Sequence, residues 1–176
     1  MQAQQLETTR LVLRGHVLDD FDDCAALWGD PAVTRHIGGR PSTPEESWSR
    51  LLRYRGHWEL IGFGYWVLAD RASGRFLGEA GLASYRRAIE PPLPDWPEAG
   101  WVLRPDAWGR GLATEALTAI LGWADRSLAA PGTVAIFDPG HAASLRVAVK
   151  AGYGDWRRCR YHGLDTLAGR RLRPAG

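Results

Sequence analysis

The stretch "EAGWVLRPDAWGRGLATEAL", residues 98–117, decides the fold, because an apolar strand gives way there to a helix through a loop with two glycines one residue apart. The first six residues, Glu98 to Leu103, predict a strand, and an apolar stripe from Leu117 to Ala124 predicts a helix. Gly109 and Gly111 would let a charged ligand approach the unpaired amides at the start of that helix. We therefore expect the loop to bind a phosphate or a pyrophosphate, although glycines before a helix also serve as plain turns.

Two common phosphate-binding loops do not match this stretch. A P-loop needs a lysine after its last glycine, but Lys150, the only lysine of the chain, lies far downstream. A dinucleotide fingerprint needs a further glycine three residues after the second, and Thr114 stands there. Hydrolysis of ATP or GTP and binding of NAD are therefore disfavoured.

The rest of the chain predicts an α/β sheet layered with helices. Helices are expected at residues 18–30, at 42–58 with Thr43 and Glu46 as a capping box, and at 143–152. Strands are expected at residues 10–16, at 133–137, and in a hairpin over 64–85 with its turn at Asp70 to Gly74. The segment from Arg87 to Gly100 holds four prolines, so a stiff loop is predicted before the strand that starts at Glu98.

Length and composition predict one soluble domain over residues 1–176, with 45% hydrophobic and 24% charged residues. Cys24 and Cys159 have no metal-ligand spacing, so neither a metal site nor a disulfide framework is expected, and a reducing cytoplasm fits best. No segment resembles a signal peptide or approaches the roughly 20 apolar residues of a membrane span. We expect neither export nor membrane insertion.

The net charge of +2 is small, but residues 156–161 and 169–174 are dense in arginine. Such stretches can bind nucleic acid. A solvated surface is the favoured interpretation, because the chain has no broad basic pattern and no recognisable RNA motif.

Three stretches together resemble the GNAT N-acetyltransferases, in particular the branch that includes the ribosomal-protein N-terminal acetyltransferases (RimJ/RimL-like). They are "LETTRLVLRGH" (6–16), "EAGWVLRPDAWGRGLATEAL" (98–117) and "HAASLRVAVKAGY" (141–153). The resemblance implies a mixed, mostly antiparallel central sheet that is flanked by helices and splayed at the cofactor site. It also implies acetyl-CoA as co-substrate.

By this resemblance, the amides from Gly109 to Thr114 would hold the pyrophosphate of acetyl-CoA, and the pantetheine arm would lie along Trp101 to Leu103 like an extra strand. Trp108 stands where the family motif usually begins with arginine or glutamine. Arg146 and Lys150 lie one turn apart and would face either a CoA phosphate or solvent. The predicted cofactor-binding residues are Trp101, Val102, Leu103, Trp108, Gly109, Arg110, Gly111, Leu112, Ala113, Thr114, His141, Ser144 and Lys150.

The candidate general base is Glu98, acting through a water, with Glu79 as second choice. Each also fits an ordinary structural acid. An α-amine with a pKa near 8 is about two units easier to deprotonate than a lysine amine, so a weak base would suffice for it.

The candidate general acid is less clear, because Ala148 stands where the family commonly has a tyrosine. Ser144 fits a proton donor to the thiolate and an ordinary helix cap equally well. His141 replaces a usual asparagine and fits a CoA contact, a participant in proton transfer or a solvent-exposed loop residue. Tyr153 and Tyr161 are further candidates.

The sequence thus predicts an acetyl-CoA-dependent N-acetyltransferase that acts by direct attack of a primary amine in a ternary complex. The acceptor, a protein N-terminus or a small molecule, would enter beside the first two helices and the proline loop with Asp95 and Trp96. An acyl-CoA-binding regulatory module without transferase activity is the alternative, and an arginine-rich RNA-binding domain ranks last. Neither nucleic acid nor a membrane is an expected partner, and a homodimer is left open.

Overall fold

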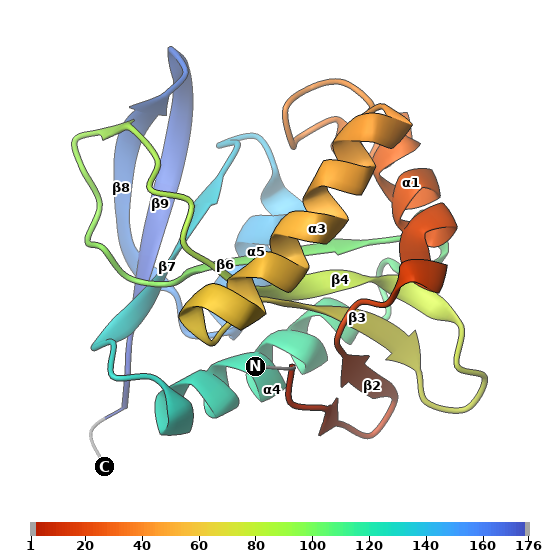
Figure 1. Ribbon diagram of the computed structural model, residues 1–176. Coiled ribbons are helices and arrows are strands. Elements are labelled where there is room, and N and C mark those ends of the chain that lie inside the picture. The colour runs from red at the N-terminus through yellow and green to blue at the C-terminus, as the bar shows by residue number, and fades with distance from the viewer. Residues whose placement is uncertain (1–2, 175–176) are drawn as a thin grey trace.

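The computed structural model describes residues 3–174, and in this range nine strands form one sheet in the order β1-β2-β3-β4-β6-β7-β9-β8-β5. Every neighbouring pair is antiparallel except β6 and β7, which are parallel. The predicted mixed, mostly antiparallel sheet is therefore confirmed. Figure 1 shows its long strands crossing the molecule, with β8 and β9 standing out on one side.

The elements follow one another along the chain as groups of strands and groups of helices. The strands are β1 (Leu6–Glu7), β2 (Leu11–Arg14), β3 (Tyr65–Asp70), β4 (Phe76–Ala83), β5 (Ile89–Glu90), β6 (Glu98–Leu103), β7 (Gly132–Phe137), β8 (Gly154–Tyr161) and β9 (Leu164–Leu172). The helices are η1 (Leu18–Asp20), α1 (Phe21–Gly29), α2 (Pro31–Thr34), α3 (Pro44–Ile61), η2 (Pro105–Ala107), α4 (Leu112–Ser127) and α5 (Ala142–Lys150).

The helices cover both faces of the sheet (Figure 1). Helices α1 and α3 pack against one another over β3 and β4, and α4 and α5 pack together on the opposite face. The apolar stripe predicted for α4 is buried, including Leu117, Ile120 and Leu121. Among the described helices, none is both long and apolar enough to cross a bilayer.

The capping box of α3 is present as predicted. The Thr43 hydroxyl accepts from the Glu46 amide at 3.2 Å, and the Glu46 carboxylate accepts from the Thr43 amide at 2.8 Å. Pro44 occupies the first helical turn, where its missing N–H costs nothing. The predicted capping box therefore marks the start of this helix, with Thr43 as its N-cap.

The sheet opens between β6 and β7. Their only register pair is Glu98 with Val134, where the Val134 amide also donates to the Pro97 carbonyl at 3.0 Å. Beyond Glu98 the two parallel strands share no register pair within the described chain. The strands therefore diverge toward their carboxyl ends, beside the start of α4, which confirms the predicted splay.

Two sequence predictions were wrong or incomplete at the far side of the sheet. The proline segment was predicted as loop throughout, but Ile89 and Glu90, just before its first proline, pair with Tyr161 and Arg160 as the short strand β5. The arginine-dense stretches lie largely in β8 and β9, for which no strands were predicted. Successive exposed arginines hide the alternation of strand residues there, because β8 buries only Cys159.

Candidate active site

The glycine loop leaves a row of backbone amides open. Gly109 and Gly111 have φ of +71° and +77°, a left-handed conformation that favours glycine, and Gly111 is the N-cap of α4. Within residues 3–174, no protein acceptor lies in hydrogen-bonding range of the amides from Gly109 to Thr114. These six N–H groups stand at the positive end of a 16-residue helix, which is a ready site for an anion.

Side chains from distant segments brace this loop. The Trp108 indole N–H donates to the Leu103 carbonyl at 2.7 Å, which ties the loop to the end of β6. Arg10 donates to the Arg110 carbonyl at 2.8 Å and pairs with Glu115 in the first turn of α4. Burial alone would raise the pKa of Glu115, but hydrogen bonds from Thr8 and Arg10 hold it below its usual value. The loop is therefore fixed from outside while its amides stay free.

Trp101, Val102 and Leu103, the three residues predicted to contact the pantetheine arm, differ in the hydrogen bonds that their backbones already make. Val102 is paired with Glu79 of β4, and the Leu103 carbonyl already accepts from Trp108. The backbone N–H and C=O groups of successive strand residues point to opposite edges of the strand. Since those of Val102 point to β4, those of Trp101 point to the opening between β6 and β7. Its indole ring lies 5.5 Å from the Phe137 ring, centroid to centroid, and so reaches across that opening.

Glu98 lies at the point where the two strands part, and it is held by Arg87. The two Glu98 oxygens accept from Arg87 Nε at 2.8 Å and from Arg87 Nη2 at 2.9 Å, and the Glu98 side chain is 13% exposed. Arg87 also donates to the Tyr161 hydroxyl at 3.0 Å. Each carboxylate oxygen keeps one further lone pair, through which Glu98 can accept from a water.

Aromatic rings cover the face of the sheet next to Glu98. The Tyr54 and Tyr65 rings are stacked with centroids 4.3 Å apart, and the Arg87 guanidinium lies 4.3 Å from the centre of the Tyr85 ring. Gly100 of β6 must be a glycine, because a Cβ there would overlap the Tyr65 hydroxyl. Burial raises the pKa of all three tyrosines, so they stay neutral at physiological pH.

Glu79, the second candidate base, lies in a fully buried cluster. Its oxygens accept from His16 Nε2 at 2.8 Å, from the Cys24 thiol at 3.1 Å and from the Trp28 indole at 2.7 Å. Burial alone would raise the pKa of Glu79, but these hydrogen bonds and the charge of His16 lower it. His16, Cys24 and Glu79 carry the kinds of atom that bind metals, and here the His16 nitrogen and the Cys24 thiol both hydrogen-bond to the Glu79 carboxylate.

The candidate acid region lies at the start of α5. His141 is the N-cap residue but makes no side-chain cap, and Ser144 lies inside the helix with its hydroxyl 3.4 Å from His141 Nε2. The interpretation of Ser144 as a cap was therefore wrong, because the helix begins before it. Tyr153 is buried and shares a 2.7 Å hydrogen bond with Thr133, and Ala148 is fully buried.

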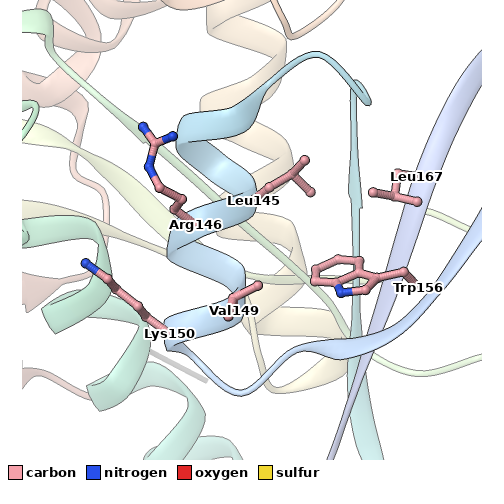
Figure 2. A pocket seen from close by; sticks show the side chains of 6 residues that line it. All are labelled: Leu145, Arg146, Val149, Lys150, Trp156 and Leu167. Carbon is pink, nitrogen blue, oxygen red and sulfur yellow. The ribbon is translucent and has the colours of Figure 1, made fainter.

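Arg146 and Lys150 also lie on α5, and Figure 2 shows them extending from one side of the helix. Leu145, Trp156 and Leu167 lie on the other side. The groove that these residues line with Val149 has a volume of about 380 Å³. Both basic side chains are exposed, which keeps their charges available to a solvent-borne ligand.

A comparison with protein families matches residues 10–154 to the acetyltransferase (GNAT) domain. The chain belongs to the GNAT acetyltransferase family. The match confirms the predicted fold class and the prediction of an acetyl-CoA-dependent acyltransferase. It spans the glycine loop, the opening between β6 and β7, and α5.

Individual GNAT relatives agree with this assignment. The chain is 33% identical to a putative GnaT-family acetyltransferase from Bordetella pertussis, with a TM-score of 0.84 over 97% of this chain and 100% of that one. It is 28% identical over 155 residues to the uncharacterized protein YkkB of Bacillus subtilis (strain 168), covering 84% of each chain. At 14% identity and a TM-score of 0.76, over 96% of this chain and 98% of the other, it shares its fold with RimL, a ribosomal-protein alpha-N-acetyltransferase solved in complex with coenzyme A.

Several residues around the site were not found from the sequence. Arg87 comes from a segment that was predicted as a loop. Tyr65 comes from a strand whose sequence shows no polar motif, and His36 follows α2, a helix that was not predicted. The only usable signal was Gly100, since a glycine in a strand interior often marks a close approach. Of the predicted residues, Trp108 is joined to Leu103 by a hydrogen bond, while Glu79 is separated from solvent.

Proposed function

We propose that this protein transfers acetyl from acetyl-CoA to a primary amine by direct attack in a ternary complex. The observation that carries the proposal is the row of unpaired amides from Gly109 to Thr114, placed beside the opening between β6 and β7. A diphosphate bound to those amides would direct the attached pantetheine arm into the opening. The single acetyltransferase domain over residues 1–176 would then hold both reactants.

The cofactor side of this proposal uses mainly the main chain. The amides of residues 109–114 would hold the pyrophosphate, with positive charge from Arg110 nearby. The Trp101 main chain would form strand-like hydrogen bonds to the pantetheine arm. We assign Lys150 to the phosphate end of the cofactor, because it extends from the same side of α5 as Arg146 (Figure 2).

The acceptor side uses side chains. The amine would lie next to Glu98, and Glu98 would accept its proton through a water, since Arg87 occupies one lone pair of each oxygen. The Ser144 hydroxyl would donate a hydrogen bond to the departing thiolate. We assign Glu79 a structural role, because its side chain is 1% exposed and its carboxylate is already bonded to three donors.

The acceptor class within primary amines is a further part of the proposal. A protein N-terminus or another α-amine is favoured, because an α-amine loses its proton more readily than a lysine amine and so needs less help from a base. The fold shared with RimL is consistent with this choice. A cytoplasmic location and a homodimer stay predictions.

A module that binds acyl-CoA without transferring the acyl group is the second candidate. It is favoured by Ala148, which is buried and stands where the family commonly has its tyrosine acid. In this case the cofactor loop would be intact and the chemistry lost.

One experiment separates the two candidates. The protein is incubated with acetyl-CoA and a panel of peptides with free N-termini, free amino acids and small polyamines, and release of free thiol is followed. Thermal unfolding with acetyl-CoA, CoA and NAD is measured beside it, because a ligand bound only by the folded state raises its stability. Thiol release with any amine supports the transferase. Stabilisation by CoA without thiol release supports the module, and no stabilisation by CoA contradicts both.

A further inference from the structure

The segment between α2 and α3, residues 35–43, contacts the start of α5 through a stacked pair of histidines. The rings of His36 and His141 lie 4.4 Å apart, centroid to centroid, with 12° between their planes. These residues are separated by more than a hundred positions in the sequence. The stack therefore connects the acceptor face, which carries α1 to α3, with the candidate acid region.

Asp138 anchors the His36 ring. His36 Nδ1 lies 2.7 Å from the Asp138 carboxylate, and the other oxygen of that carboxylate accepts from the Gly140 amide at 2.8 Å. The Asp138 carbonyl also accepts from the His141 amide at 2.9 Å. One short turn after β7 thus fixes both histidines, His36 through its ring and His141 through its backbone.

The His141 ring in turn contacts the candidate acid. His141 Nε2 lies 3.4 Å from the Ser144 hydroxyl, one helical turn further along. His141 has no hydrogen bond among the described residues besides this one and its backbone contacts. The stacked His36 ring is therefore the contact that fixes the plane of the His141 ring.

We propose that His36 is a positioning residue for acetyl transfer: held by Asp138, it fixes the His141 ring, and His141 orients the Ser144 hydroxyl toward the departing thiolate. The inference rests on the proposed function, because it assigns His36 to the same site. We name the three residues His36, Asp138 and His141 the histidine clasp. The clasp also holds residues 35–43 beside the site, where an acceptor would enter.

The charges of the clasp make its action depend on pH. Burial lowers the pKa of His141, and the charge of His36 lowers it further, while Asp138 opposes this. The charged groups that act on the His141 ring are thus His36, from the α2–α3 segment, and Asp138, from the turn after β7. Two protonated rings at 4.4 Å would repel one another, so we expect the stack to open at low pH.

Three variants test the clasp. His36→Ala removes the ring, His36→Phe keeps a flat ring without the bond to Asp138, and Arg40→Ala removes an exposed ion pair from the same segment without touching the clasp. The first readout needs no turnover: the ring nitrogens of His141 are titrated by NMR in each protein. In both His36 variants the His141 titration should move to higher pH, because the opposing charge is gone. In Arg40→Ala it should stay in place.

The second readout is turnover with the best amine of the panel. His36→Ala should lower kcat about tenfold and leave the KM for acetyl-CoA unchanged, because positioning of the acid is lost and cofactor contacts are kept. His36→Phe should recover part of kcat, and in both variants the acid limb of kcat should move to higher pH. Unchanged His141 titration in His36→Ala overturns the clasp. If the wild type turns over no amine, the proposed function fails, and the titration still decides whether the clasp exists.

Discussion

The two sides of the opening between β6 and β7 are built in different ways. The proposed cofactor side is a continuous stretch of main chain, residues 109–114, whose amides make no hydrogen bond to the described protein at the start of α4. The acceptor side is made of side chains from distant segments, including the Arg87–Glu98 pair, Tyr65 and the histidine clasp. Under the proposed function, cofactor binding would resist side-chain changes, whereas the acceptor could vary with few substitutions.

The largest effect is expected from a change to the main-chain conformation of the cofactor side. Gly109→Val would place a branched side chain at a residue with φ of +71°, a left-handed conformation that favours glycine. The loop would have to change its conformation, and its amides would no longer be placed to bind a phosphate. We expect CoA affinity to fall about 100-fold or more, equivalent to about 2.7 kcal/mol. Isothermal titration calorimetry with CoA measures this directly.

Gly74→Val is the matched control. Gly74 lies in the turn between β3 and β4 with φ of +73°, and neither glycine has an atom within 4 Å of the position of a Cβ. Both variants should lose about 1–2 kcal/mol of stability from the left-handed conformation. Only Gly109→Val should lose CoA binding. Equal CoA affinity in the two variants would contradict the role of the loop amides.

What the sequence could predict follows the same division. The strand 98–103, the loop and the start of α3 are encoded locally, by an apolar run, by glycines at a helix start and by the Thr43–Glu46 capping box. The pairing of His36 with Asp138 depends on how segments 102 positions apart meet, which no local pattern specifies. Strands β8 and β9 were missed for a different reason, because exposed arginines on both faces of β8 remove the alternation that marks a strand.

The second prediction concerns the buried scaffold of the acceptor face. In Glu79→Gln, an amide NH₂ would meet the donors His16, Cys24 and Trp28, so at least one buried donor would lose its acceptor. We expect a loss of about 2–3 kcal/mol in the free energy of unfolding at pH 7, measured by urea denaturation. CoA affinity should stay unchanged, because no loop amide is touched.

This loss should depend on pH. The pKa of Glu79 is lower in the folded protein than its ordinary value of 4.5, so its carboxylate stabilises the fold above that value. The contribution is lost as the pH falls below about 4.5 and through the folded pKa. The difference between wild type and Glu79→Gln should therefore shrink as the pH falls below about 4.5. A difference that stays constant over this range would argue against an ionised Glu79.

The third prediction is that a change on the proposed acceptor side of the opening affects the KM for the amine but not the affinity for CoA. Arg87→Ala leaves the Glu98 carboxylate, which is 13% exposed, without its guanidinium partner. Because the pair is only partly buried, we expect a loss of about 1–2 kcal/mol, below the full cost for a buried pair. The KM for the amine should rise and CoA affinity should not change. Arg40→Ala, which breaks a pair with exposures of 65% and 41%, should leave the stability almost unchanged, because solvent screens an exposed pair.

The smallest effect is expected from Trp108, one of the side chains that brace the glycine loop. Trp108→Phe removes the 2.7 Å hydrogen bond from the indole to the Leu103 carbonyl and keeps an aromatic ring. The net contribution of one hydrogen bond to stability is about 0.5–1.5 kcal/mol. Because Trp108 is 49% exposed, we expect the CoA affinity to fall only about threefold. Calorimetry with CoA measures the change beside that of Gly109→Val.

Trp48→Phe provides the control for the ring itself. Trp48 is 38% exposed, and within the described residues its indole N–H has no hydrogen-bond partner. The Trp48→Phe variant should therefore bind CoA with the same affinity as the wild type. If Trp108→Phe lost as much affinity as Gly109→Val, cofactor binding would depend on a side chain as strongly as on the backbone, and the two sides of the opening would no longer differ in kind. A threefold loss against a 100-fold loss would instead place the binding energy in the amides, with Trp108 only keeping them in position.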